Sequence, residues 1–370
     1  MRRFSFKIAE EPDDQAIRKV IENTPMEGKI GIAFKREPSY FAAATVGNEF
    51  HQTIIATEES SGDIVAVGSR SIKSAYINGE VSPVGYLSSL RIKDNYRNNL
   101  LLARGYEYLN KLHQDKKAPL YITSIVSDNV PALGLLTSER AGLPRYRDLG
   151  SYCTTAIGLS RRNHDLRGGL TIIRGSHKNI DAIVACLNRN GKNKQFYPYY
   201  TKELFLSGNG MLRDFVLDNF YAAVKDDAIV GVAAKWDQGN FKQTLVTGYR
   251  GSLRFIKAFY NLGAALAGLP LLPRPNTRLK LLYAGFIAVD NNDEGIFRAL
   301  LRALYNGAAA SGYDYLLVGL CQNDPLLKPI REGYCFIKYE SRVFAVVWDD
   351  GLDLYNKLDG RIPYLELATL

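Results

Sequence analysis

The segment from Arg91 to Lys117 carries the residues of this sequence that are best suited to hold an anion. It contains three acids against seven basic side chains, which are Arg91, Lys93, Arg97, Arg104, Lys111, Lys116 and Lys117. In its middle, Arg97 and two neutral asparagines precede an apolar pattern of helical spacing that begins at Leu100. The first N–H groups of a helix have no partner inside the helix, and with the helix dipole they attract phosphate groups. The segment therefore predicts a phosphate-binding helix start.

The segment from Asp290 to Glu294 also precedes a helical pattern, which begins at Gly295, but its charge is opposite. Its three carboxylates would repel a phosphate group, and no basic residue follows before Arg298. The segment imitates the first six positions of an EF-hand calcium loop, yet the twelfth position, which requires a bidentate Glu, is Leu301. The sequence therefore predicts a solvated turn here and favours the first half of the chain for anion binding.

Residues that bind metals or form disulfides are scattered. The histidines and cysteines fall in different predicted elements without metal-ligand or CxxC spacing, and they are His51, His113, His164, His177, Cys153, Cys186, Cys321 and Cys335. We therefore expect no metal, reduced cysteines and a cytoplasmic protein. The first residues alternate apolar and polar side chains, and the longest apolar stretch, 255–272, is interrupted by Lys257, Asn261 and Pro270. We expect neither a secretory signal nor a membrane span.

The segment from Tyr364 to Leu370 offers a further candidate for chemistry. It alternates like a short strand and carries one acid, Glu366, among apolar neighbours. If the segment docks between two halves of the molecule, Glu366 or the terminal carboxylate of Leu370 could enter a cleft and act as a base. The plainer interpretation, an edge strand that completes a sheet, is favoured.

The length of 370 residues predicts two domains, and 46% hydrophobic residues can form a core in each. The net charge of +9 favours an anionic partner, which a phosphate-bearing cofactor or a nucleic acid would satisfy equally. The oligomeric state is not indicated.

The elements that must position these residues occur in a repeated order. The first half predicts strands at 3–9, 51–58, 63–79, 81–92, 119–126 and 146–158 and helices after 10, at 39–47, 100–112 and 130–141. The second predicts strands at 170–176, 219–225, 228–236, 243–249, 280–289, 314–321 and 335–348, and helices at 178–189, 210–218, 252–267 and 295–311, with a short helix after 321. Each half has one strand–helix–strand crossover, which implies a parallel pair in an otherwise antiparallel sheet.

A polar, basic stretch that ends in two glycines, residues 159–169, separates the halves as a linker. Leu100 lies 29 positions before Asn129, and Gly295 lies 28 positions before Asn323, so the halves are predicted to share one fold. We expect domains at 1–158 and 170–370, the second with an apolar insertion at 252–276 that shields the junction or closes over a substrate. Aromatic residues at 195–205 favour packing at the domain junction over an acceptor pocket.

The segment from Leu90 to Ala103, followed by Asn129-Val130-Pro131-Ala132 and then Gly142-Leu143, resembles the motifs of the GNAT superfamily of N-acyltransferases in order and separation. The resemblance implies an α/β protein of the α+β type, with two GNAT-like domains that each have a mixed, mostly antiparallel sheet flanked by helices. It also implies a binding site for acetyl-CoA or another acyl-CoA. The residues that the resemblance assigns to it are Leu90, Arg91 and Ile92 along the pantetheine arm, Arg97, Asn98, Asn99, Leu100, Leu101 and Leu102 around the pyrophosphate, and Asn129.

This sequence departs from the family pattern at several of these positions. Asn98, Leu100 and Leu102 stand where the family has glycine or alanine, and Ser88 and Leu136 stand where many members have an acidic base and a tyrosine acid. The catalytic residues are therefore unknown, with Glu366 as a weak candidate. N-myristoyltransferases, which also have two GNAT units, use a terminal carboxylate as base.

Three functions remain open on these residues. The first is transfer of an acyl group, by resemblance acetyl, from CoA to a small-molecule or peptide amine. The second is a non-catalytic tandem GNAT-fold protein that binds a ligand or partner. The third is a Fem-type aminoacyl transferase using charged tRNA, which ranks lower because no long basic arm is present, and a nucleic-acid partner is accordingly not expected.

Overall fold

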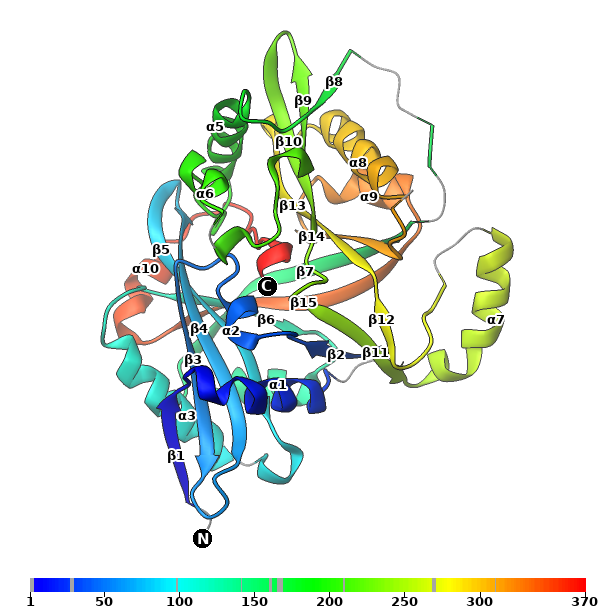
Figure 1. The fold of residues 1–370 in the computed structure, drawn as a ribbon. Coiled ribbons are helices and arrows are strands. Elements are labelled where there is room, and N and C mark those ends of the chain that lie inside the picture. The colour runs from blue at the N-terminus through cyan, green and yellow to red at the C-terminus, as the bar shows by residue number, and fades with distance from the viewer. Residues whose placement is uncertain are drawn as a thin grey trace.

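The computed structural model describes residues 3–26, 30–97, 99–140, 142–159, 162–164, 169–208, 210–267, 271–309 and 311–370. In these residues one long mixed sheet runs through the whole molecule (Figure 1). Its strand order is β1 (Phe4–Ile8), β3 (Phe50–Glu58), β4 (Ile64–Ile77), β5 (Glu80–Ile92), β6 (Tyr121–Val126), β15 (Phe336–Val347), β7 (Arg145–Gly158), β14 (Tyr315–Cys321), β13 (Leu281–Val289), β10 (Ala228–Asp237), β9 (Phe220–Lys225) and β8 (Thr171–Arg174).

The sheet consists of two similar halves. In the first, β3, β4 and β5 form an antiparallel meander, and β5 is parallel to β6 across helix α3 (Asn99–His113). In the second, β9, β10 and β13 are antiparallel, and β13 is parallel to β14 across helix α8 (Glu294–Ala309). The predicted parallel pairs and the mixed, mostly antiparallel fold class are confirmed.

The two halves exchange their last strands at the centre of the sheet. Strand β7 of the first half pairs with β14 of the second, whereas β15 of the second half pairs with β6 of the first. The exchanged strands are also antiparallel neighbours over their full length, from Phe336 opposite Ile157 to Val347 opposite Arg145. The division into domains at 159–169 remains a proposal, and that segment lies partly outside the described residues.

A small second sheet joins the halves on one side of the long sheet. It contains β12 (Thr277–Leu279), β11 (Gln243–Tyr249) and β2 (Ile30–Lys35), and β2 comes from the first half. Strand β2 was not predicted from the sequence, and 243–249 was expected to pair with the other strands of the second half. Pairing over a separation of more than 200 residues leaves no local signal in the sequence.

Helices cover the long sheet on both faces. The helices besides α3 and α8 are α1 (Asp14–Asn23), α2 (Tyr40–Ala44), α4 (Val130–Leu136), α5 (Ile180–Gly191), α6 (Lys202–Leu206), α7 (Ser252–Ala267), α9 (Leu327–Gly333) and α10 (Leu352–Asn356), and of these α7 contacts β11 of the small sheet. The predicted helix at 210–218 is wrong, because only the short 3₁₀ turns Gly210–Leu212 and Leu217–Asn219 form there. The predicted strand at 364–370 is also wrong, because the chain turns into a 3₁₀ helix at Leu367–Thr369.

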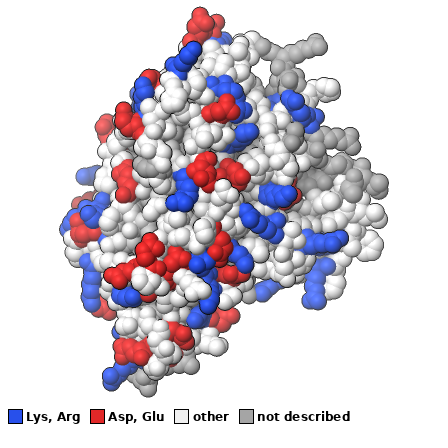
Figure 2. Space-filling model, in the orientation of Figure 1, with Lys and Arg blue, Asp and Glu red and all other residues white. Residues whose placement is uncertain are grey.

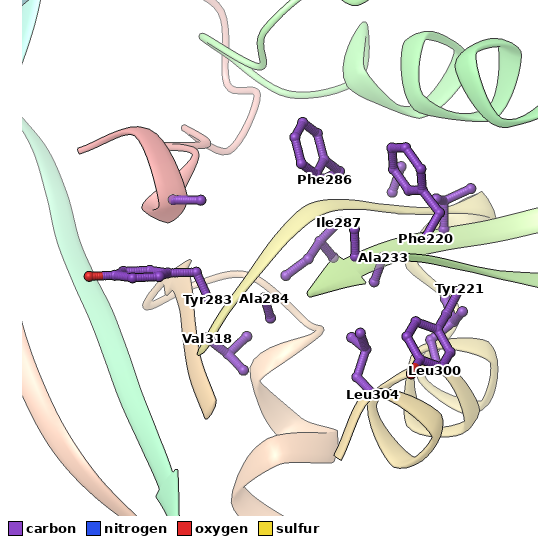
Figure 3. Close-up of a cluster of buried hydrophobic side chains, with 14 of the residues drawn as sticks. Phe220, Tyr221, Ala233, Tyr283, Ala284, Phe286, Ile287, Leu300, Leu304 and Val318 are labelled. Atoms are coloured by element: carbon purple, nitrogen blue, oxygen red, sulfur yellow. The ribbon is translucent and has the colours of Figure 1, made fainter. Parts of the chain in front are cut away.

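The largest core lies in the second half, on both faces of β13 and β10. Figure 3 shows Phe286 and Phe220 on one side of these strands and Leu300 and Leu304 of α8 on the other. All four side chains are at most 1% exposed. The first half has smaller cores, and one of them lies between α3 and the sheet around Leu102, Tyr106 and Leu109. The second half is thus the more completely filled of the two.

Polar contacts hold the start of helix α2 against the start of helix α1. Asp14 at the start of α1 accepts hydrogen bonds from Ser39 Oγ (2.9 Å) and from the N–H of Tyr40 (2.8 Å), where α2 begins. Ser39 Oγ in turn accepts from the N–H of Ala42 and caps α2. These bonds satisfy N–H groups that the helix itself cannot pair. They hold α2, and with it Tyr40, against the sheet.

Candidate active site

Strands β5 and β6 separate soon after they pair. Their ladder contains only Gly85 opposite Tyr121 and Tyr86 opposite Ile122, and beyond it Thr123 Oγ1 donates to the carbonyl of Leu87 at 2.8 Å. A bulge follows in β5, where Ser89 has a φ of 57°. Splayed parallel strands expose main-chain groups that a ligand can bind.

A cavity of about 520 Å³ extends from this gap to the junction of the halves. The end of β5 forms one wall through Ser88, Ser89 and Leu90, and the small sheet forms another. Residues from the C-terminal segment, Leu367–Leu370, also line it. This volume is within the range of small-molecule and cofactor sites.

One arm of the cavity is apolar and runs between α3 and the sheet. It is lined by buried side chains that include Leu102, Tyr106, Leu109, Leu136 and Tyr146. Gly105 of α3 also lines it, and a Cβ there would first meet Phe6 Cε1 at 3.6 Å. An arm with these walls favours an aliphatic chain over a polar group.

Three cationic side chains, those of Arg36, Arg91 and Lys242, line the cavity. Among the described residues no Asp or Glu lines it. Burial lowers the pKa of Arg91 to about 10 and that of Lys242 to about 7, and in each case repulsion by Arg36 contributes. Arg91 Nε is buried without a hydrogen-bond partner, although another guanidinium nitrogen of Arg91 donates to the carbonyl of Leu90 at 2.8 Å. Such a site is suited to an anionic ligand, because buried charges need a partner.

Lys242 lies where the C-terminal segment meets the cavity. Its Nζ donates to the main-chain oxygen of Leu370 at 2.5 Å and lies 5.1 Å from the ring centre of Tyr283. Nearby, Gln238 Nε2 donates to the carbonyl of Ala368 at 2.6 Å, and Lys73 Nζ donates to Thr369 Oγ1 at 3.2 Å. These contacts from both halves hold the segment at the junction.

A network of hydroxyl groups borders the same cavity in the first half. Tyr40 Oη is 2.9 Å from Thr53 Oγ1 and 2.8 Å from Ser69 Oγ. His51 completes it, with Nδ1 at 2.8 Å from Ser71 Oγ and Nε2 at 2.9 Å from Thr53 Oγ1. Burial lowers the pKa of His51 to about 4, so its ring is neutral at physiological pH.

The second half has a bulge at the corresponding place, but this bulge is occupied. Phe286, three residues after the last β13–β14 pair, has a φ of 55°, just as Ser89 lies three residues after the last β5–β6 pair. The N–H of Phe286 donates to Glu366 Oε2 at 2.7 Å. Tyr364 Oη donates to the same carboxylate oxygen at 2.9 Å and lies 3.3 Å from the main-chain nitrogen of Ile287.

Several residues that the sequence assigned to the cofactor line the cavity: Leu90, Arg91, Ile92, Leu101, Leu102 and Asn129. Asn129 also caps α4, since its Oδ1 accepts from the N–H of Ala132 at 3.2 Å. Leu100 is 55% exposed, and Asn98 lies outside the described residues, as does the side chain of Asn99.

The remaining predicted site residues lie outside this set. Arg97 is exposed near the start of α3 and forms an ion pair with Asp94 at 2.9 Å. Glu366 is 1% exposed and faces β13 of the second half. The segment does dock between the halves, as the sequence analysis considered, and Leu370 rather than Glu366 reaches the cavity.

Arg36 and Lys242 face the cavity but were not predicted as site residues from the sequence. Arg36 follows β2, Lys242 precedes β11, and Lys35 pairs with Gln243 between these strands. The pairing brings together two cations that are 206 positions apart. Neither belongs to a motif, so only the pairing of β2 with β11 could have revealed them.

The described residues contain no cluster of three or more metal-ligating side chains, and no helix among them is long and apolar enough to cross a bilayer. All four cysteines are free, and Cys153, Cys186 and Cys321 are buried. Burial raises the pKa of the Cys186 and Cys321 thiols to about 12, so they are protonated at neutral pH.

A parallel strand pair, a bulge three residues beyond it and a helix after the bulge are present once in each half, as the resemblance to the GNAT superfamily implied for the fold. The sequence resemblance to this family is thus confirmed for the fold. No family model matches the chain, and no curated protein sequence matches it.

Several solved structures share the fold of this chain at low sequence identity. N-myristoyltransferase from Saccharomyces cerevisiae with bound myristoyl-CoA is 11% identical, with a TM-score of 0.60 over 93% of this chain and 78% of that one. A GCN5-related N-acetyltransferase from Sphaerobacter thermophilus is 14% identical, with a TM-score of 0.55 over 99% of this chain and 98% of that one. The glucosamine N-acetyltransferase region of a fungal multi-domain GH3 β-N-acetylglucosaminidase is 10% identical, with a TM-score of 0.61 over 93% of this chain and 38% of that one. At these identities the likeness is one of fold.

Proposed function

We propose that this protein transfers an acyl group from acyl-CoA to an amine and that the first half holds the acyl-CoA. The observation that carries the proposal is the cavity at the open bulge of β5, next to cations and an apolar arm. The corresponding bulge of β13 supports the same assignment, because Glu366 already fills it. The solved structures of similar fold include an N-myristoyltransferase with bound myristoyl-CoA and a GCN5-related N-acetyltransferase.

The thioester would lie along the end of β5. Its carbonyl oxygen would accept a hydrogen bond from the main chain at Ser89, as Glu366 Oε2 does from Phe286 in the second half. Such a donor stabilises the negative charge that develops on oxygen when the amine attacks. The phosphate groups would face Arg97 and the start of α3 at the rim, with Arg91 beside them.

The apolar arm along α3 supports an acyl chain longer than acetyl. A two-carbon group would leave the space beside Tyr106, Leu109 and Tyr146 empty, and each buried methylene of a longer chain adds about 0.8 kcal/mol. We therefore favour a medium or long acyl group over the acetyl group that the family resemblance suggested.

The amine would enter from the junction, where Lys242 is the best-placed group to accept its proton. A pKa of about 7 leaves a large fraction of Lys242 neutral at pH 7 to 8, and its hydrogen bond to Leu370 orients the nitrogen. His51 is also neutral, but both ring nitrogens are engaged with hydroxyl groups. The sequence-based suggestion that the carboxylate of Leu370 is the base remains a prediction.

A second candidate function is binding without transfer. Ser88 lines the cavity at the family's base position and Leu136 at its acid position, and neither side chain can exchange a proton in this pH range. The same site would then hold an acyl-CoA and present it to a partner. Release of free CoA thiol in the presence of an amine separates the two candidates.

Isothermal titration with acetyl-CoA, octanoyl-CoA and myristoyl-CoA tests the proposal. We expect one site per chain and tighter binding of the longer thioesters. An absence of heat with all three, at ligand concentrations up to about 1 mM and with a folded protein, would falsify it. Equal affinity for the three would overturn only the assignment of the apolar arm.

A further inference from the structure

Helix α7 exposes its largest apolar side chains to solvent, although it also packs on the protein through Leu253 and Ala264. Phe255, Phe259 and Leu262 lie on one stripe of the helix and are 76%, 80% and 67% exposed. Aromatic side chains of this size are rarely left in water unless the surface binds something. Figure 1 shows α7 at the outer edge of the molecule, beyond β11 and β12.

The inner stripe of α7 contains two apolar residues, Leu253 and Ala264, and two polar residues that make specific contacts. Lys257 Nζ donates to the carbonyl of Pro273 at 2.6 Å. Asn261 forms two hydrogen bonds with Leu272. Asn261 Nδ2 donates to the carbonyl of Leu272 at 2.9 Å, and the N–H of Leu272 donates to Asn261 Oδ1 at 2.8 Å. These bonds fix the rotation of α7 about its own axis, and in this rotation Phe255 and Phe259 point into solvent.

The segment that carries α7 has charged residues of one sign. Residues 238–289 contain no Asp or Glu and seven basic residues, of which five have exposed positions: Arg250, Arg254, Arg274, Arg278 and Lys280. In Figure 2 blue side chains without red ones occupy the lower right edge, near the place of β11 and α7 in Figure 1. A second copy of this surface would be repelled by the like charges.

We infer that α7 is a peripheral membrane anchor that binds the surface of a bilayer containing anionic lipids, with Phe255, Phe259 and Leu262 inserted between headgroups. Helices that lie in the membrane interface combine an apolar face carrying Phe or Leu with flanking Lys and Arg. The protruding helix presents side chains rather than a groove, which fits a soft lipid surface. The inference does not depend on the proposed acyl transfer.

Helix α7 lies beside the cavity, so a membrane bound to it would lie close to the site. Pro273, which accepts hydrogen bonds from Lys257 and from Tyr249 Oη, is also a cavity-lining residue. A bilayer bound to α7 would therefore lie next to one wall of the cavity. An amphiphilic ligand that partitions into the membrane would be brought close to the site.

Sedimentation with lipid vesicles tests the anchor without any acyl-CoA. The wild-type chain is expected to sediment with phosphatidylcholine vesicles containing about 30% phosphatidylserine, and less as salt is raised. Phe255→Ser with Phe259→Ser should reduce the bound fraction at least about tenfold, because two large apolar side chains no longer insert. Arg254→Glu with Arg274→Glu should reduce it by about the same factor on anionic vesicles only.

The control variant is Val81→Ser with Val216→Ser, which removes exposed apolar side chains at 48% and 58% exposure elsewhere and should sediment like the wild type. Circular dichroism establishes that each variant is folded. The inference is overturned if the wild type stays in the supernatant, if the phenylalanine variant sediments equally, or if phosphatidylcholine alone binds as well. A dimer in solution that the phenylalanine variant abolishes would overturn it in favour of a second copy.

Discussion

The bulges of β5 and β13 are built alike and used differently. Ser88 and Ser89 face a cavity, whereas the corresponding Gly285 and Phe286 contact Glu366, with the amide of Phe286 bonded to its carboxylate. Gly285 leaves the space for this contact, because a Cβ there would lie 2.9 Å from Glu366 Oε1. A repeated fold therefore does not imply a repeated site. A single acid carried by the C-terminal segment is enough to close one of the two.

Replacing Lys242 tests whether the second half completes the site of the first. Lys242→Met and Lys242→Arg are each expected to lower kcat about 10² to 10⁴-fold, since neither side chain can accept the proton. Activity of the wild type should rise with pH to a plateau above about 7, because the neutral amine is the reactive form. Lys235→Met, whose residue lies outside the cavity lining, is the control. A kcat that Lys242→Arg leaves intact would assign Lys242 a positioning role.

Replacing Glu366 opens the occupied bulge. Glu366→Ala leaves the N–H groups of Phe286 and Ala368 without their acceptor, so the free energy of unfolding should fall by about 3 kcal/mol. Urea denaturation measures this, with Lys328→Ala at an exposed ion pair as the control with little effect. An unchanged stability would show that the second bulge does not need its carboxylate.

The same residue predicts a pH dependence. Burial raises the pKa of Glu366, so the folded chain binds its proton more tightly than the unfolded chain. The contribution of Glu366 is therefore fully present below its unfolded pKa and is lost as pH rises through the folded one. The stability of the wild type relative to Glu366→Gln should accordingly increase from neutral pH towards about pH 4. A difference that is constant with pH would contradict this.

Filling the apolar arm of the first half tests the acyl-chain assignment. Gly105→Leu is expected to weaken binding of myristoyl-CoA about 30-fold or more and to leave acetyl-CoA binding nearly unchanged, because the added side chain occupies the arm. Gly134→Leu is the matched control, since Gly134 also lies in a helix but has open space around it. Both variants gain helix propensity of roughly 0.5–1 kcal/mol, so stability does not separate them. Equal loss with both thioesters would place the arm elsewhere.

The smallest effect is expected when an arginine near the start of α3 is replaced and compared with one near the start of α8. Arg97→Glu should weaken acyl-CoA binding about tenfold by setting a carboxylate against the phosphates, whereas Arg298→Glu near the start of α8 should not. Both arginines are in exposed ion pairs, with Asp94 and Glu332, so their cost in stability is similarly small. Equal effects in titration calorimetry would remove the distinction between the halves.

Local patterns in the sequence were sufficient for most of the fold. The meander of β3 to β5, the helix after β5 and the crossover to β6 follow from alternation, helical spacing and turn residues, which act over a few positions. The same signals predicted α7 within its observed bounds. They failed at 210–218 and 364–370, where tertiary contacts rather than propensity set the backbone. Tyr364 and Glu366, for example, turn towards β13.

The sequence by itself determined the doubled fold, the basic segment before α3 and the acidic turn before α8, since these depend on neighbouring residues. Only the tertiary structure decided which bulge is open, because Glu366 reaches Phe286 across 80 positions. It likewise decided that Arg36 and Lys242 share one cavity, through the pairing of β2 with β11. Contacts between distant segments depend on how strands pair and which surfaces are buried together, and no short stretch of sequence records them.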